Sequence, residues 1–347
     1  LYHYTLHGAM EAALLFMAVW WVWIYTTWVL NWLDPEVLEV RLLLFALMTA
    51  GLFLSMAIPG AFEDRGLVFA AAYVAMQLGR TIFMLAVVWS QPSRRSTYQR
   101  ITLYFAVSAV VWLWGGMVED HHLRLELWAV ALAIDFLGPV LSYRVPGMGR
   151  DHSTNWRISG AHMAERCGLF VIICLGETLL VSGATFAEME WTTGGTAAFL
   201  ASILGTVGMW WVYFHIGHRR ASHQIEHAED TGAIGRLAFT YLHIPIVAGV
   251  VLAAVGAERA IAHPGDVATW AEGASVIGGV AMFLFGNGLF KWTTGRWFPL
   301  SHIGGLVLSL LVFLAGPWMS LVMQATLAAV VLVVVAVWEH RSLGGSA

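Results

Sequence analysis

Apolar runs, each about as long as a membrane-crossing helix, follow one another along almost the whole chain. A helix needs about 20 apolar residues to cross the hydrocarbon core of a bilayer. No stretch alternates short strands with amphipathic helices, as a soluble α/β protein would. The pattern therefore predicts an all-α, polytopic transmembrane helical bundle. Eleven spans are expected, at residues 8–31, 40–59, 66–89, 98–118, 125–143, 160–185, 194–217, 236–256, 271–290, 298–315 and 317–338.

The span at residues 160–185 is unusual because three charged residues interrupt its apolar run. Glu165, Arg166 and Glu177 all lie inside it. A charge at membrane depth costs a few kcal/mol unless it is paired or hydrated. We therefore expect this helix to have an interior face that meets partners, water or a substrate.

The composition agrees with a membrane protein. The chain is 59% hydrophobic and 12% charged, and that charged fraction is about half of the usual one in soluble domains. Cys167 and Cys174 would lie about 10 Å apart on one helix, too far for a disulfide, and are expected to be packing residues. The balance of charge gives no reason to expect nucleic-acid binding, and no oligomeric state is predicted.

Basic residues are strongly biased to one side of the predicted bundle. The connectors after the odd-numbered spans contain Arg41, Arg94, Arg95, Arg100, Arg144, Arg150, Arg157, Arg219, Arg220, Arg236, Lys291, Arg296 and Arg341. The opposite side contains Arg65, Arg124 and Arg259. The positive-inside rule then predicts a cytoplasmic C-terminus in the cell membrane and an external first residue. The sequence opens at LYHYTLHG, without Met, so a missing upstream helix, the twelfth, is expected.

Two aromatic motifs suggest an internal repeat. Trp20-Trp21-Val22 and Trp210-Trp211-Val212 are 190 residues and six spans apart. Because six is even, the two halves would run parallel, related by an axis along the membrane normal. We expect a first half at residues 1–150 with its first helix missing, a second half at 151–341 and a short tail at 342–347. Trp residues also gather at membrane interfaces for generic reasons, which is the alternative explanation.

Four segments of the chain resemble one known family. They are WWVWIYTTWVLNWLDPE (Trp20–Glu36), AFEDRGLVFAAAYVAMQLGR (Ala61–Arg80), HMAERCGLFVIICLGETLLVSGATF (His162–Phe186) and YLHIPIVAGV (Tyr241–Val250). On these segments the chain resembles the bacterial low temperature requirement A (LtrA) family. The resemblance covers essentially the whole chain. The resemblance implies an opening helix with a Glu-Leu-Phe-Phe-Asp pattern, which this sequence lacks. It implies an architecture rather than a particular activity.

The charges of the span at 160–185 cannot satisfy one another. With a rise of about 1.5 Å per residue, Arg166 and Glu177 are about 16 Å apart along the axis. Glu165 and Arg166 are adjacent and point about 100° apart. Each charge must therefore find its partner on another helix or in water. The polar candidates within or beside the spans are Glu11, Gln77, Arg80, Asp135, His162 and His243.

The count of buried charges favours a transport pathway. Inside the spans the four acids Glu11, Asp135, Glu165 and Glu177 face the two bases Arg80 and Arg166. If both bases are paired, up to two carboxyls remain either protonated or matched to a mobile cation, because desolvation favours the neutral form. A proton-coupled transporter or cation pathway for a small solute or ion needs such groups.

We assign provisional roles on that basis. Glu177 would titrate or bind a cation, with Glu165 as a second candidate. Arg166 and Arg80 would be counter-charges, with Asp135 their partner and Gln77 one turn from Arg80. His162 and His243 would form the cytoplasmic proton exit.

Two other classes of function remain open. The chain could be an intramembrane enzyme with Glu165, His162 and His243 around a metal or lipid substrate. It could also be a structural membrane protein whose charges only join helices. The pattern His223-Gln-Ile-Glu226-His227 matches a zinc motif but lacks a third ligand, so no metal or cofactor is expected. Gly278, Gly279, Gly286 and Gly288 are expected to allow close helix contact.

Overall fold

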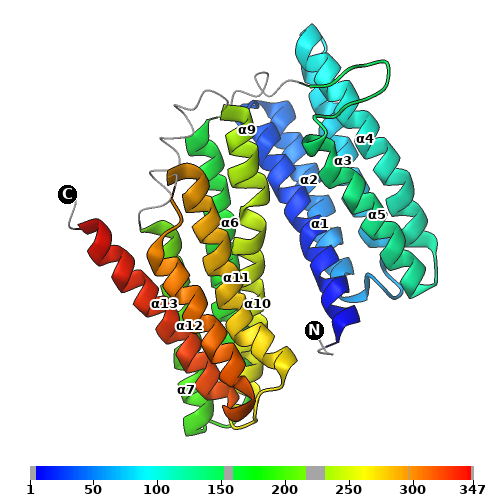
Figure 1. The fold of residues 1–347 in the computed structure, drawn as a ribbon. Coiled ribbons are helices and arrows are strands. Elements are labelled where there is room, and N and C mark those ends of the chain that lie inside the picture. The colour runs from blue at the N-terminus through cyan, green and yellow to red at the C-terminus, as the bar shows by residue number, and fades with distance from the viewer. Residues whose placement is uncertain (1–4, 152–158, 216–230, 296, 345–347) are drawn as a thin grey trace. The chain divides into compact units, whose positions relative to one another are not determined.

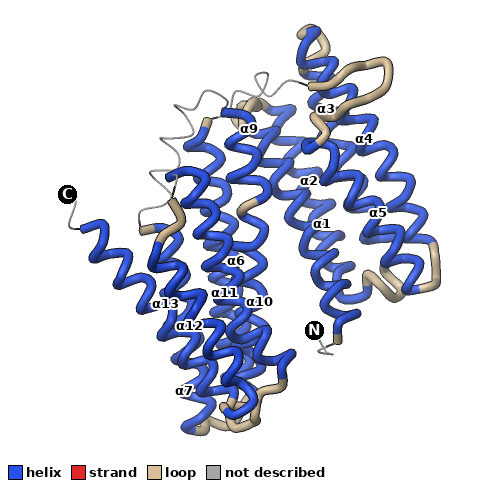
Figure 2. The backbone as a smooth tube through the Cα atoms, in the orientation of Figure 1, coloured by secondary structure: helices blue, strands red, loops and turns tan. Residues whose placement is uncertain are grey.

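The structure is a computed structural model that describes residues 5–151, 159–215, 231–295 and 297–344 (Figure 1). The chain divides into two compact units, which we call the N-terminal unit (Leu6–Ile158) and the C-terminal unit (Ser159–Ala347). Within the described residues the regular structure is helical, without strands (Figure 2). The predicted zinc-like pattern at His223 to His227 lies outside the described residues.

Five long helices make up the described part of the N-terminal unit. They are α1 (Leu6–Leu30), α2 (Leu38–Ala57), α3 (Gly66–Val87), α4 (Pro92–Met117) and α5 (His121–Val140), with the short 3-10 helix η1 (Ile58–Gly60) after α2. α3 packs between α2 and α4, α5 packs on α4, and α1 contacts both α3 and α5. Four tryptophans fill the core with no exposed surface: Trp20, Trp21, Trp112 and Trp128.

Six long helices make up the described part of the C-terminal unit. They are α6 (Gly160–Glu188), α7 (Thr193–Phe214), α10 (His243–Ala262), α11 (Trp270–Gly295), α12 (Leu300–Ala315) and α13 (Leu321–Gly344). The short helix α9 (Thr231–Gly235) and the π-helix η3 (Arg236–Tyr241) lead into α10, and the 3-10 helix η4 (Gly316–Trp318) follows α12.

The predicted all-α bundle is confirmed. Among the described residues, ten helices are long and apolar enough to cross a membrane, with α9, η3 and α10 counted as one span. The eleventh, α5, has 20 residues but contains Arg124, Glu126 and Asp135. The chain is therefore a multi-pass membrane protein.

Helices follow the same order of contacts in both units. In the N-terminal unit the neighbours run α2–α3–α4–α5–α1, and in the C-terminal unit they run α10–α11–α12–α13–α7. Chain order and these contacts match α1 to α5 with α7, α10, α11, α12 and α13, although α1 also contacts α3 whereas α7 also contacts α10. In addition, α6 packs against α7 and α10.

Glycines bring α10 and α11 into close contact, as the sequence predicted for Gly279 and Gly286. A Cβ atom on Gly279 would lie 2.5 Å from the main-chain nitrogen of Ala253 in α10. A Cβ atom on Gly286 would lie 2.7 Å from the main-chain nitrogen of Ile246. Gly278 differs, because a Cβ atom there would meet nothing within 4 Å. Small residues that let two backbones approach are a common basis of helix packing in membranes.

Arg124 joins three segments at one end of the N-terminal unit. The sequence placed it in a connector, but α5 begins earlier than expected because Asp120 caps it by accepting a hydrogen bond from the main-chain nitrogen of Leu123 at 2.7 Å. Arg124 is therefore the fourth residue of α5 and is only 4% exposed. Its guanidinium group donates hydrogen bonds to the carbonyls of Ala61, Glu63, Gly115 and Val118.

Candidate functional site

Asp135 lies in the core of the N-terminal unit with only part of its carboxylate satisfied. It is 1% exposed. Oδ2 accepts hydrogen bonds from the Tyr73 hydroxyl at 2.8 Å and from Trp112 Nε1 at 3.2 Å. Oδ1 has no hydrogen-bond partner among the described residues, although the Ser108 hydroxyl, which bonds to the Phe105 carbonyl, lies nearby. The Ser108 hydroxyl is thus the nearby donor that could turn to Oδ1, which otherwise lies in an aromatic environment without a partner among the described residues.

Arg80 is the base of the same core and is completely buried. One terminal nitrogen donates to the carbonyl of Val22 at 3.2 Å and to the Thr26 hydroxyl at 2.9 Å, both on α1. The other donates to the side-chain carbonyl of Gln77. The guanidinium group also lies over the ring of Tyr25, 5.5 Å from its centroid, in a cation–π contact. Its Nε has no partner among the described residues.

Tyr73 and Gln77 connect Asp135 to Arg80. The Gln77 amide nitrogen donates to the Tyr73 oxygen at 3.2 Å, while Tyr73 donates to Asp135 and Arg80 donates to Gln77. We call these four residues the relay. Among the described residues no ion pair joins Asp135 directly to Arg80. The structure thus brings together three predicted residues, Gln77, Arg80 and Asp135, and separates the two charges by two neutral side chains.

Glu11 lies elsewhere in the N-terminal unit. Its carboxylate is 3.1 Å from Nε2 of His7, one turn earlier on α1. The His7 ring in turn lies 5.0 Å from the ring of His122 at the start of α5. Glu11 therefore belongs to a histidine contact near one end of the unit and not to the relay.

The charges of α6 do not lie in the interior of the C-terminal unit. Glu165 and Glu177 are exposed on this unit, and Arg166 is partly buried. Among the described residues Arg166 Nε has no hydrogen-bond partner. The main chain of His162 forms part of the helix start, where Ser159 caps it. The buried face of α6 is formed instead by small and apolar residues, which include Ala164, Cys167 and Val171.

His243 is fully buried where the π-helix η3 meets α10. Its Nδ1 lies 2.8 Å from the carbonyl of Ala238, which can only accept, so this nitrogen carries the hydrogen. In the neutral ring Nε2 then accepts from the Tyr213 hydroxyl, 2.8 Å away. Pro245 follows two residues later and has no N–H for the helix ladder, which fits the irregular turn before it. Both nitrogens of His243 are thus occupied by its own unit.

A second buried base and acid lie in the C-terminal unit. Lys291 Nζ is 2.6 Å from Glu339 Oε1 and also donates to the carbonyl of Val212 at 3.1 Å. The two side chains are 10% and 7% exposed. Nearby, Nε2 of His302 lies 2.9 Å from the Asn287 side-chain oxygen. The sequence gave little weight to Lys291, because a lysine near a helix end can extend to the interface.

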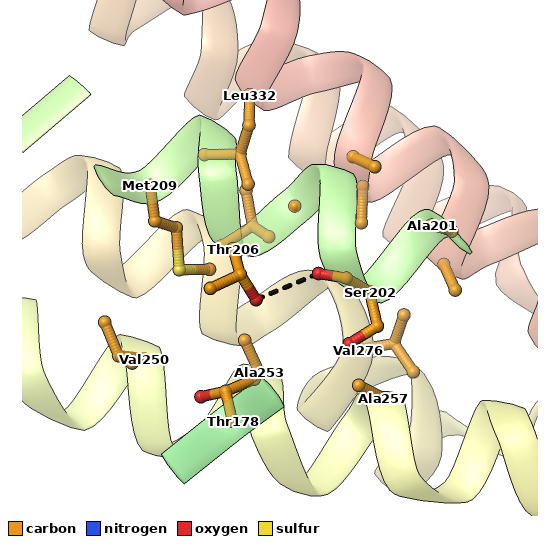
Figure 3. A pocket seen from close by; sticks show the side chains of 15 residues that line it. Thr178, Ala201, Ser202, Thr206, Met209, Val250, Ala253, Ala257, Val276 and Leu332 are labelled. Atoms are coloured by element: carbon orange, nitrogen blue, oxygen red, sulfur yellow. Dashed lines mark hydrogen bonds between the residues drawn. The ribbon is translucent and has the colours of Figure 1, made fainter. Parts of the chain in front are cut away.

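A small cavity lies between α6, α7, α10, α11 and α13 (Figure 3). Its walls are mostly alanine and aliphatic side chains, and its polar groups come from Thr178, Ser202 and Thr206. Both threonine hydroxyls donate to main-chain carbonyls within their own helices, so each offers only lone pairs to the cavity. About 40 Å³ is open to the centres of water molecules, and one water needs about 10–15 Å³ on that measure. The cavity has room for a few waters.

Sequence reasoning missed several of these polar residues. Tyr73 could have been found, because positions 73, 77 and 80 recur at helical spacing on one face of α3. Glu339 lies one residue beyond the predicted last span, so it was not counted among buried charges. No group of three or more His, Cys, Asp or Glu that could hold a metal ion occurs in the described part of the chain. Cys167 and Cys174 are free thiols.

Comparisons with known proteins place these features in one family. The family model of the bacterial low temperature requirement A protein (LtrA) matches residues 1–337. The uncharacterized protein RA0937 of Rhizobium meliloti (strain 1021) is 42% identical over 342 residues, which are 98% of this chain and 83% of that relative. No solved structure matches the chain.

Proposed function

The chain belongs to the bacterial low temperature requirement A (LtrA) family, and we propose that this multi-pass membrane protein moves a small solute or ion, with proton exchange at Asp135. The relay from Asp135 through Tyr73 and Gln77 to Arg80 is the observation that carries the proposal. A direct ion pair would suffice to hold two helices together. Here the two charges stay apart, and each has an unsatisfied polar atom among the described residues.

Protonation of Asp135 would change the order of donors along the relay. Tyr73 now gives its only hydrogen to Asp135 and receives one from Gln77. A proton on the other oxygen, Oδ1, would neutralise the carboxylate and make Oδ2 a weaker acceptor, so the bond that Tyr73 donates would weaken and its hydroxyl could direct the hydrogen elsewhere. Gln77 is next in the chain, because its amide nitrogen bonds to Tyr73 and its oxygen accepts from Arg80.

Arg80 passes this change on to α1. Its guanidinium group donates hydrogen bonds to the Val22 carbonyl and the Thr26 hydroxyl of α1. The same group donates to Gln77, so a change in the orientation of Gln77 would shift the guanidinium group and its bonds to α1. A proton bound on α5 would thereby alter how α3 and α1 are joined. Transport by alternating access requires such a two-state contact, whose balance the bound proton shifts.

The strong bias of basic residues supports a position in the cell membrane with the C-terminal end of α13 in the cytoplasm. In that orientation Asp135 and Arg80 lie within the membrane span, away from both surfaces. A buried carboxylate at that depth can exchange protons only if water or a neighbouring group reaches it. The free Oδ1 atom is where such a group would bind.

Proton flux into proteoliposomes tests the proposal. Vesicles with a trapped pH-sensitive dye would receive inward gradients of ammonium, K⁺, Na⁺ or small neutral solutes. We expect at least one gradient to drive protein-dependent proton movement. In Asp135→Asn this movement should fall to the level of empty vesicles, because the amide keeps the shape of the side chain but cannot carry the proton.

Glu126→Gln is the matched control, since Glu126 is an exposed acid on the same helix. It should retain the flux of the native protein. The transport proposal is contradicted if, for every gradient, both the proton and the solute cross the membrane no faster than they do in empty vesicles. Full flux in Asp135→Asn would contradict the role of the relay and favour interhelical attachment as the purpose of these charges.

A further inference from the structure

The bases of α3 and α11 bind the first helix of their own unit at the same motif. Arg80 donates to the carbonyl of Val22, and Lys291 donates to the carbonyl of Val212, at 3.2 and 3.1 Å. Each valine is the third residue of a Trp-Trp-Val sequence, in α1 and in α7. Since α1 and α3 match α7 and α11 in chain order, the two bases contact the same position of the motif in the helix matched to α1.

A second correspondence involves the fourth residue of α5 and of α13, Arg124 and Gln324. Both side chains are buried, 4% and 0% exposed. In each unit one glycine lies near the start of α3 or α11, and another lies near the end of α4 or α12. An added Cβ atom on the glycine would contact the buried side chain, or the glycine carbonyl accepts a hydrogen bond from it. These glycines are Gly66 and Gly115 for Arg124, and Gly273 and Gly316 for Gln324. These two side chains therefore have matching surroundings, and we use them to align the two units at this end.

The spacing from that end places the charges consistently. Arg80 follows Gly66 by 14 residues, and Lys291 follows Gly273 by 18. On the fifth helices, Asp135 follows Arg124 by 11 residues and Glu339 follows Gln324 by 15. Both differences are four residues, which is about one helical turn or about 6 Å. Relative to the N-terminal unit, the base and the acid of the C-terminal unit are therefore offset by the same amount in the same direction.

We infer that Lys291 and Glu339 are the C-terminal unit's counterpart of Arg80 and Asp135, so that each half of the chain holds one base–carboxylate site that exchanges a proton. The function of this second site rests on the proposed proton-coupled transport. The geometric match between the units does not depend on it. Glu339 would take its proton from water and return it there, and Lys291 would keep its bond to the Val212 carbonyl meanwhile.

The second site differs from the first in having a direct contact. The Nζ–Oε1 distance of 2.6 Å leaves no neutral residue between the charges. A proton on Glu339 would remove the charge that Lys291 faces, whereas a proton on Asp135 acts on Arg80 through Tyr73 and Gln77. Other titratable or charged side chains described near this end of the unit include His215 and Tyr213 of α7, His243 of α10, His302 of α12, His340 and Arg341 of α13, Arg236 and Tyr241 of η3, and Glu165 and Arg166 of α6.

Infrared difference spectra of the full chain in lipid, recorded between neutral and acid pH, test the inference without a known substrate. A buried carboxylic acid gives a C=O band that its amide variant loses. We expect separate bands that disappear in Glu339→Gln and in Asp135→Asn, and that remain in Glu258→Gln, the variant of an exposed acid on α10. Gln at position 339 can still accept from Lys291, so this variant should fold.

The flux assay separates the two proposals. Loss of proton flux in Glu339→Gln, with flux kept in Glu258→Gln, supports a second site, because Glu258 is an exposed acid on α10 that makes no part of either site. If Asp135→Asn abolishes flux while Glu339→Gln keeps both full flux and every carboxylic acid band, the inference is overturned and the proposed function stands. If the native protein moves nothing but both bands are assigned, the proposed function fails and the equivalence of the sites remains.

Discussion

Gly279→Ala should lower the free energy of unfolding by about 2 kcal/mol, within the range that overpacking costs in tight interfaces. The new methyl group would lie 2.5 Å from the main-chain nitrogen of Ala253. A main-chain atom cannot turn aside as a flexible side chain can, so α10 and α11 would have to separate. Dispersion contacts along both helices would be lost, and these drive helix association in a bilayer.

Gly278→Ala is the matched control for this change. The two glycines are adjacent on α11, but a Cβ atom on Gly278 meets nothing within 4 Å. Alanine is favoured over glycine in a helix by about 1 kcal/mol, so this variant should be as stable as the native protein or slightly more stable. Thermal unfolding of the two variants in the same detergent makes the comparison. Equal losses at both positions would contradict the close contact between α10 and α11.

Arg80→Met should destabilise the protein by about 3–5 kcal/mol, the usual cost of removing one partner from a buried set of charges. Methionine fills similar space but leaves the Asp135 carboxylate without its counter-charge. The Gln77 oxygen and the Val22 carbonyl would each lose a donor. The change should also uncouple α3 from α1.

A double-mutant cycle shows whether Arg80 and Asp135 act together. The pair Arg80→Met and Asp135→Asn removes both charges, so the loss should be smaller than the sum of the two single losses by about 1 kcal/mol or more. Strict additivity in thermal or denaturant unfolding would mean that the relay transmits no interaction between them. Because the two residues are not in contact, the coupling energy combines the through-space attraction of the two charges with the hydrogen bonds through Tyr73 and Gln77.

The helices could be predicted from the sequence because hydrophobic length is a local property. The lower hydropathy of α5, which leaves it out of the ten helices apolar enough to cross a membrane, also has a local cause, because Arg124 and Asp135 lie within it. The partner of Glu11 was also within reach, because His7 lies one turn away on the same helix. Such features need only the order of residues and the pitch of a helix.

The partners of the other charges could not be predicted, because they depend on how each helix is rotated about its axis. Asp135 was expected to pair directly with an arginine, and the structure instead places Tyr73 and Gln77 between it and Arg80. Glu177 was expected to be the group that titrates or binds a cation, and in its own unit it lies on the exposed face of α6. Periodicity gives the face of a helix but not which neighbour covers it.

The two units also explain why Lys291 was undervalued. Its position near a helix end suggested an interfacial side chain, a reasonable expectation for a lone lysine. The contact with Val212, set beside the contact between Arg80 and Val22, is the observation from which we infer that it is the counterpart of Arg80.

Tyr73→Phe, measured for both proton flux and unfolding, is the most direct test of the relay. Phenylalanine keeps the ring contact with Trp112, whose centroid is 4.5 Å away, and removes only the hydroxyl between Asp135 and Gln77. Tyr104→Phe, which removes the bond from Tyr104 to the Arg144 carbonyl, is the control. We predict that Tyr73→Phe costs about 1–2 kcal/mol in stability but reduces flux to the level of empty vesicles. Unchanged flux with the same loss of stability would contradict the account.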